Sequence, residues 1–216
     1  MIDGTTLQQD LRQRWNWLTD AISVSHALSE PVWELLLAAY SEPWRHYHTL
    51  QHIQETLSLL DQFTRPRGDL IHLSLALWFH DVVYKPEARD NEEASIILTT
   101  TSLQRWPLLP VTFREIERLI FITKSHQTSR DDILGHIILD ADLAILGKER
   151  THYQRYSEQI RAEYAWVDEA AYRSGRTQIL RRFLERPQIY HTSQMASLEG
   201  AARDNLQWEI GQLQEN

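Results

Sequence analysis

Cysteine is absent from the 216-residue chain. This absence excludes disulfides, thiolate zinc sites and cysteine nucleophiles together. Any metal ligand on a side chain must therefore come from histidine, aspartate or glutamate. The lack of thiols also fits a reducing compartment, so we expect a cytoplasmic protein.

Long apolar runs and an excess of positive charge are missing as well. No apolar run approaches the ~20 residues of a membrane span, and the N-terminal MIDGTTLQQDLRQR is too polar for a signal peptide. The formal net charge of −8 repels long nucleic acids on average, although a local basic pocket can still bind a small phosphate. We expect neither a membrane nor a long nucleic acid as partner, and no pattern predicts an oligomeric state.

Glycine and proline are scarce, seven each, and they separate segments of helical period. This pattern predicts an all-α chain with almost no strands and a single domain over residues 1–216. We expect a helix opened by Pro31, another over about 91–105, and capping boxes at Thr112 and Ser129. The last of these helices ends at Gly147, and three amphipathic helices follow, with Met195 on the stripe of the final one.

One predicted helix, DLIHLSLALWFHDVVY, is apolar almost all round, which is typical of a helix at the centre of a bundle. His80 and Asp81 lie side by side within it. An unpaired carboxylate buried there would cost several kcal/mol, so Asp81 needs a cation, a network of donors or a metal ion.

A second pair of carboxylates interrupts the apolar segment HIILDADLAILG. Asp140 and Asp142 are two positions apart, which is about 200° on a helix, so both cannot face one point. At most one of them can share a site with Asp81. The residue pattern alone leaves the choice open.

The segment WRHYHTLQHI contains three histidines, and His52 falls in the first turn of a helix capped by Thr49. His52, His80, Asp81 and one of the two later aspartates would form a mixed nitrogen and oxygen site. Such a site suits Mn, Fe, Co, Ni, Zn or Mg and leaves positions open for water. The hypothesis requires His52 to lie within about 5 Å of the His80-Asp81 pair.

The ordered set His52, His80-Asp81 and Asp142 resembles the signature of the HD-domain metal-dependent phosphohydrolases, an all-helical superfamily. The segments RHYHTLQHI, WFHDVVY, DNEEAS, TKSH and DADLAILG together resemble a bacterial family of predicted HD-superfamily phosphohydrolases. The resemblance implies an HD-type helical bundle with a metal-site core over about 41–147 and packing helices over about 149–214.

YHTLQH is also similar to the metal-site element of cyclic-nucleotide phosphodiesterases. That similarity implies that His52 is a metal ligand, that His48 protonates the leaving group, and that Asp142, in its ADL context, is the fourth ligand. The longer phosphodiesterase domain and most of its other motifs are missing, so specificity for cyclic nucleotides does not carry over.

Further site residues are predicted from resemblance and position. Family resemblance suggests Glu92 as a contact to a metal-bound water or to a second ion. His126 either complements a helix dipole or is a substrate-side ligand of that second ion, and either His48 or His126 donates the proton to the leaving oxygen. Arg45, Lys85 and Lys124 are the basic residues nearest to the site in sequence and are candidates to neutralise a phosphate.

These expectations define a metal-dependent phosphohydrolase for a small phosphate ester or anhydride, such as a nucleotide or a related metabolite. One divalent ion, or two, would activate water, with Asp81 holding the metal and orienting the water. Two alternatives stay open at the level of sequence. One is an HD-type di-iron oxygenase that uses Glu92 or Glu93 and His126 as extra ligands, and the other is a non-catalytic module whose metal only stabilises the bundle.

Overall fold

The computed structural model describes residues 4–215, so positions 1–3 and 216 of the predicted domain range lie outside it. The all-α prediction is confirmed, because residues 4–215 contain helices and no strand. The helices are α1 (Gly4–Ile22), α2 (His26–Ala39), α3 (Leu50–Leu59), α4 (Arg67–Phe79), α5 (Asn91–Leu103), α6 (Pro110–Thr123), α7 (Ile133–Asp142), α8 (Arg150–Glu163), α9 (Glu169–Leu184) and α10 (Glu199–Glu215), with short 3₁₀ turns at Leu60–Gln62, Leu143–Gly147 and Ala196–Leu198.

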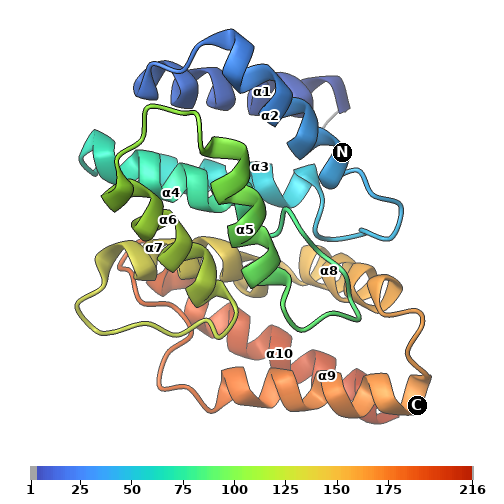
Figure 1. Cartoon of the computed structure of the whole chain (residues 1–216). Coiled ribbons are helices and arrows are strands. Elements are labelled where there is room, and N and C mark those ends of the chain that lie inside the picture. Colours follow the sequence, from blue (N-terminus) through green and yellow to red (C-terminus); the bar gives the residue numbers. More distant parts are fainter. Residues whose placement is uncertain (1–3, 216) are drawn as a thin grey trace.

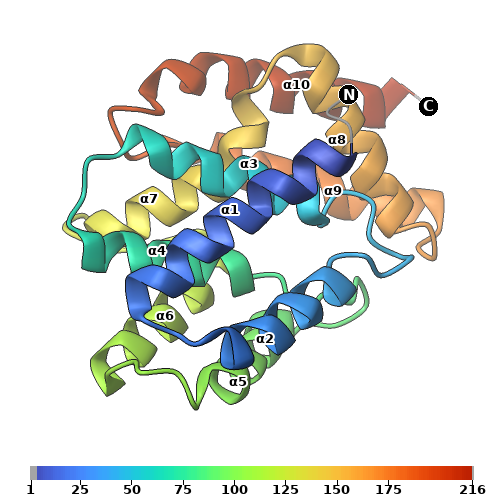
Figure 2. The same cartoon turned by 90° about the horizontal axis from the view of Figure 1, so that it is seen from above.

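Helix α4 lies at the centre of the bundle and contacts α1, α3, α5, α6 and α7. Helices α1 and α2 lie at one end of the molecule and α9 and α10 at the other, with α3, α4 and α7 between them (Figures 1 and 2). This placement explains why α4 is apolar on nearly every side: residues 73–79 are all buried. None of the helices within residues 4–215 is long and apolar enough to cross a membrane.

Four tryptophans form the centre of the N-terminal half of the core. Trp15 lies with its ring centroid 5.5 Å from that of Trp78, 5.6 Å from Trp106 and 6.1 Å from Trp33. All four are at most 5% exposed. Tilted and edge-on contacts of this kind are favoured by the ring quadrupoles and add to the large apolar area that the rings bury. This cluster fixes α1 and α2 against the central helix.

Three predicted helix starts are wrong. Helix α2 begins at His26 and contains Pro31 in its interior rather than in its first turn. Pro110 occupies the first turn of α6 and sets its start before Thr112. Asp132 caps α7 by accepting a hydrogen bond from the Gly135 amide, so α7 starts later than a cap at Ser129 would place it.

The stripe predicted for the final helix also needs correction. Met195 lies before α10, and the residues that follow it form a separate 3₁₀ turn over Ala196–Leu198. Met195 is nevertheless buried. Its side chain therefore packs into the core as expected, although it does so from the connection and not from the helix.

Candidate metal centre and adjoining cavity

His80 and Asp81 lie at the end of α4 and not within it, which corrects the sequence prediction. Helix α4 ends at Phe79, and His80 is its C-cap. The chain then turns, with the Val82 amide donating to the Phe79 carbonyl over 3.2 Å. A turn at this point lets two consecutive side chains face one site, which a continuing helix would send about 100° apart.

Arg45 stabilises this turn from the segment before α3. Its guanidinium donates to the carbonyl oxygens of Asp81 (2.7 Å), Val82 (3.0 Å) and His48 (3.2 Å) and to the Glu42 carboxylate (2.9 Å). The side chain of Arg45 is fully buried. The expectation that Arg45 contacts a substrate phosphate is therefore wrong, because its donors are used to hold the two histidine-bearing segments together.

His52 reaches the same point from the first turn of α3. Thr49 caps this helix, as predicted, by accepting a hydrogen bond from the Gln51 amide. The imidazole of His52 is buried, and its Nε2 lies 3.1 Å from Nε2 of His80. The proximity of His52 to the His80-Asp81 pair, on which the metal hypothesis depends, is thus confirmed.

The donor atoms converge closely enough to share one ion. His52, His80 and Asp81 form a group that could hold a metal ion, with one ligand atom from each lying within 4.8 Å of the others. Oδ2 of Asp81 is 3.1 Å from Nε2 of His80 and 3.8 Å from Nε2 of His52. Oδ1 of Asp142 is 3.4 Å and 3.5 Å from the same two nitrogens. Two donors that each lie about 2.1 Å from one ion are at most about 4.2 Å apart, so every one of these separations fits.

The tautomer of His80 is suited to metal binding. Its Nδ1 lies 2.9 Å from the carbonyl oxygen of Leu77, and a carbonyl can only accept, so Nδ1 carries a proton. In a neutral imidazole this leaves the lone pair on Nε2, directed toward His52 and the carboxylates. A backbone carbonyl that fixes a histidine in this way is a common arrangement around metal-binding histidines.

The electrostatics of the site favour a positive charge among these side chains. Burial alone would lower the pKa of His80, but the Asp81 and Asp142 carboxylates outweigh it and hold that pKa well above its usual range. Burial likewise opposes ionisation of Asp142, yet hydrogen bonds from His126 and His52 hold its pKa well below the ordinary value. The carboxylates thus stabilise a cationic charge here, which a divalent ion can supply as well as a proton.

The side chains of the two aspartates of α7 point to different parts of the structure, as their angular separation predicts. Asp140 is fully buried and accepts hydrogen bonds from the amides of His191 and Thr192 and from the Thr192 hydroxyl. Asp142 faces His52 and His80. The structure therefore brings Asp142 to the site, whereas Asp140 anchors the segment between α9 and α10.

His48 is held beside the site by a residue that the sequence did not single out. Its Nδ1 lies 2.7 Å from Oε2 of Glu163, the last residue of α8, and its Nε2 lies 3.9 Å from Oδ2 of Asp81. Oε1 of Glu163 accepts the amides of His46, Tyr47 and His48. Burial opposes ionisation of Glu163, but the hydrogen bond from His48 prevails and lowers its pKa to about 2.

His126 lies on the opposite side of Asp142. Its Nε2 is 3.1 Å from Oδ2 of Asp142, and its backbone has a φ of 50°, in the left-handed region. This conformation follows the end of α6 and turns the imidazole back toward the site. The side chain is 26% exposed, so His126 can contact both a buried carboxylate and a ligand in the cavity.

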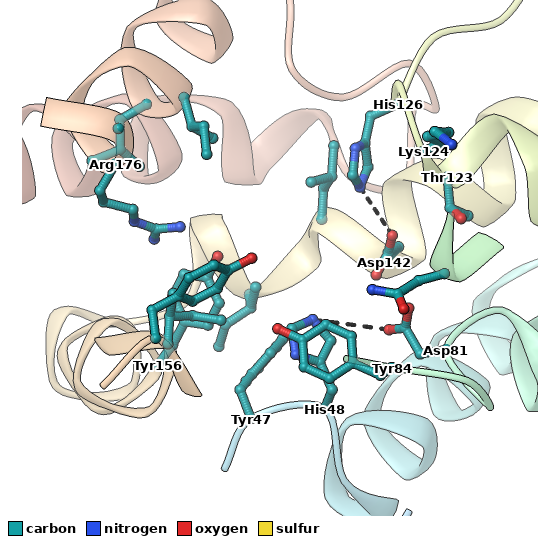
Figure 3. A pocket seen from close by; sticks show the side chains of 18 of the residues that line it. Tyr47, His48, Asp81, Tyr84, Thr123, Lys124, His126, Asp142, Tyr156 and Arg176 are labelled. Atoms are coloured by element: carbon teal, nitrogen blue, oxygen red, sulfur yellow. Dashed lines mark hydrogen bonds and ion pairs between the residues drawn. The ribbon is translucent and has the colours of Figure 1, made fainter. Parts of the chain in front are cut away.

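A cavity of about 530 Å³ opens directly from these residues. His48, Asp81, His126 and Asp142 line one end of it (Figure 3). The side chains of Asp81, Asp142 and His48 retain between 13% and 19% exposure, whereas His52 and His80 are fully covered beneath them. The candidate centre therefore has a buried base and an accessible face.

Of the three other residues predicted to contact substrate, two line the cavity and one does not. Lys124 and Glu92 line the cavity, and Lys124 also donates to the Glu93 carboxylate and the Arg89 carbonyl. Lys85 is exposed and is not among the residues that line the cavity. Its amide and carbonyl instead bond to the Asn91 side chain, which directs the turn before α5.

Helices α8 and α9 contribute cavity residues that the sequence analysis treated as ordinary packing stripes. Tyr156 lines the cavity from α8 and Arg176 from α9 (Figure 3). A usable signal exists in both helices. Glu163 continues the inward stripe of Tyr153, Tyr156 and Ile160, and Arg176 lies between Tyr172 and Leu180 at steps of four residues. A charged residue on an apolar stripe needs a partner. The partner of Glu163 is His48, which lines the cavity, and the partner of Arg176 is Glu209.

Comparisons of the chain with models of known families, with curated proteins and with solved structures yielded no match. The assignment of a function therefore depends on the site itself.

Proposed function

We propose that the protein is a metal-dependent phosphohydrolase of the HD type that cleaves a small phosphate ester or anhydride. One observation carries the proposal: donor atoms of His52, His80 and Asp81 form a buried group that could hold one metal ion, at the base of a cavity large enough for a small substrate. Oδ1 of Asp142 lies within 3.5 Å of the Nε2 atoms of both histidines and is the candidate fourth ligand. Cavities of roughly 300–1,000 Å³ are typical of small-molecule sites.

The chemistry that a divalent ion supplies in such a site is Lewis acidity, which lowers the pKa of water and withdraws charge from a phosphoryl group. His52 and His80 would hold the ion from the covered side, and Asp81 and Asp142 from the side that borders the cavity. Because two neutral histidines and two carboxylates carry a total charge of −2, they balance a divalent cation. The donor set matches Mn, Fe, Co, Ni, Zn or Mg.

His48 is the residue best placed to donate a proton to the leaving oxygen. Its Nδ1 is held by Glu163, so its Nε2 is the nitrogen directed toward Asp81 and the cavity. Burial alone would lower the pKa of His48, but the nearby Asp81 and Glu163 carboxylates raise it above the usual value. The protonated form, which a general acid requires, is therefore favoured near neutral pH.

The cationic groups that would neutralise the phosphate lie on the cavity wall across from His48. Lys124, Arg89 and His126 line the cavity around the Asp142 side. The hydrogen bond from Lys124 to Glu93 raises the pKa of the ammonium group, so it stays cationic. These groups would orient a phosphoryl oxygen while His48 faces the leaving group.

The donor geometry favours hydrolysis at one ion over oxygen activation at two. Within residues 4–215, His52, His80 and Asp81 make up the one group of three or more close histidine or acidic donors. His126 approaches this group only through Asp142, and Glu92 lies 3.9 Å from Lys124. A di-iron centre would need both residues as direct ligands.

The test is turnover of a panel of nucleotides, cyclic nucleotides and sugar phosphates. Treatment with a chelator should abolish hydrolysis, and Mn, Co, Ni or Mg should restore it. His48→Asn should lower kcat about 100-fold or more. The exposed neighbour His46, replaced by Asn in the same way, is the matched control and should leave turnover near the wild-type rate.

Two other outcomes would contradict the proposal. If the metal-loaded protein cleaves no compound of the panel, but the metal raises the melting temperature strongly, the ion only stabilises the bundle. Two irons per chain with oxygen-dependent turnover would instead indicate an oxygenase.

A further inference from the structure

The cavity extends from the candidate metal centre to a second region between α8 and α9, which we call the distal half. Six residues define it: Tyr156, Ile160, Tyr164, Val167, Tyr172 and Ile179. Figure 3 shows Tyr156 and Arg176 on the far side of the cavity from Asp142 and His126. The metal-site end and the distal half therefore form one continuous space with two different linings.

The distal half is apolar and aromatic. Three of its six residues are tyrosines, and the other three are aliphatic. Tyr47 connects it to the metal-site end, with its ring centroid 4.6 Å from Tyr156 and 4.9 Å from His52. Aromatic faces at such positions bind flat rings by offset or edge-on stacking.

The one charge on this side of the cavity is already compensated. Arg176 makes a bidentate ion pair with Glu209, at 2.7 Å and 3.1 Å, and both side chains are buried. Its guanidinium also lies 5.3 Å from the centre of the Tyr156 ring. An additional phosphate in the distal half would therefore find no unpaired cation among the residues that line it.

We propose that the distal half binds the organic group of the substrate, and that this group is uncharged and carries a planar ring. The inference rests on the proposed phosphohydrolase function, since it assumes that the phosphate lies at the metal-site end. It follows from the division of the cavity: cations and metal donors at one end, and tyrosines with aliphatic side chains at the other. Polyphosphates and small sugar phosphates fit this division poorly.

Gly175 offers a direct way to test this division. It lies on α9 and lines the cavity, and a Cβ added there meets no atom within 4 Å. The Cβ of a larger side chain therefore has open space at this cavity-lining position. Gly211 is the matched control, because it is also inside a helix and has open space around its Cβ position, but it does not line the cavity.

The experiment measures binding by calorimetry to the Mn-loaded protein, with benzylphosphonate and methylphosphonate as non-hydrolysable probes. Wild-type protein should bind benzylphosphonate at least about ten-fold more tightly than methylphosphonate, because the ring stacks on the tyrosines. Gly175→Leu should bring the ratio of the two dissociation constants close to one. Gly211→Leu should keep the wild-type ratio.

Equal affinities for the two probes in the wild-type protein would overturn the inference, and this result does not depend on any variant. An unchanged ratio in Gly175→Leu would overturn it too. A phosphonate analogue of adenosine monophosphate separates two sources of the ring: tighter binding than benzylphosphonate indicates a nucleoside, and weaker binding a simple aryl group.

The binding ratio and the turnover assays fail independently. If benzylphosphonate binds preferentially and Gly175→Leu abolishes the preference, but no phosphate ester is hydrolysed, the proposed function is wrong and the ring site stands. If esters are hydrolysed without any preference for a ring, the inference about the ring site is wrong and the proposed function stands. Absence of binding by both probes counts against both proposals.

Discussion

Oε2 of Glu163 lies 2.7 Å from Nδ1 of His48, although 115 positions separate the two residues in sequence. The same carboxylate oxygen accepts the Tyr84 hydroxyl at 2.9 Å, and the other oxygen accepts three consecutive backbone amides at residues 46–48. Glu163 is almost fully buried. The end of α8 thereby fixes both the backbone and the imidazole of the segment that leads into the candidate metal centre.

Replacing Glu163 by glutamine should lower kcat about 10- to 100-fold and change KM much less. The amide keeps the shape of the side chain but removes the negative charge that stabilises protonated His48. Glu158→Gln, at an exposed position of the same helix, is the control and should have little effect. Steady-state kinetics with elemental analysis provide the measurement. A loss of bound metal in Glu163→Gln would show that the residue supports the fold of the centre and not the proton donor.

The stability that Glu163 provides should depend on pH. Its pKa is lowered from 4.5 to about 2 in the folded protein, so its contribution is fully present above pH 4.5 and is lost as the pH falls toward 2. The wild-type protein should therefore exceed Glu163→Gln in free energy of unfolding at pH 6 by more than at pH 3.5. Urea unfolding at the two pH values measures this difference. A difference that grows on acidification would contradict the assigned ionisation.

Arg45→Met should destabilise the protein by about 2–4 kcal/mol, because the carbonyls of Asp81, Val82 and His48 would lose buried donors. The apolar volume is largely kept, so the loss reports on the hydrogen bonds. Metal affinity should fall as well, since the turn that presents Asp81 is no longer held. Arg105→Met, at an exposed position, serves as control. Unchanged unfolding in urea would rule out this role for Arg45.

Substitutions of Asp140 and of Asp142 should have different effects, one on stability and the other on metal binding. Asp142→Asn should weaken metal binding more than about 100-fold, because loss of a direct ligand exceeds the loss of an outer partner. Asp140→Asn should keep the metal but cost about 1–3 kcal/mol of stability, because the new amide group opposes the N–H donors of His191 and Thr192. Titration with Mn and thermal unfolding distinguish the two variants, and a reversed pattern would refute the assignment of Asp142.

Sequence patterns were sufficient for the helical class and for part of the candidate centre. Asp81 stands out because a carboxylate in an apolar helical segment needs a partner. The pattern left Asp140 and Asp142 as alternatives, and only the family resemblance favoured Asp142. The 200° separation of Asp140 from Asp142 correctly predicted that they would serve different places. These inferences depend on local periodicity, which a single sequence contains.

What the sequence could not supply were the contacts between distant segments. Arg45 and Lys85 were selected for their nearness in sequence to the histidines, but the direction of each side chain depends on packing that no local pattern encodes. The end of α4 at Phe79 has the same origin, because Arg45 takes up the carbonyls beyond it. Glu163 and Arg176 were missed because their helices have the stripes of ordinary packing helices.

The central claim is that the buried donors hold a divalent ion, and metal content tests it most directly. After incubation with Mn and removal of free ion, wild-type protein and the exposed control Asp131→Ala should each retain about one ion per chain, and Asp81→Ala should retain none. Elemental analysis provides the values. Equal metal content in Asp81→Ala and wild-type protein, or no ion in the wild-type protein, would contradict the account.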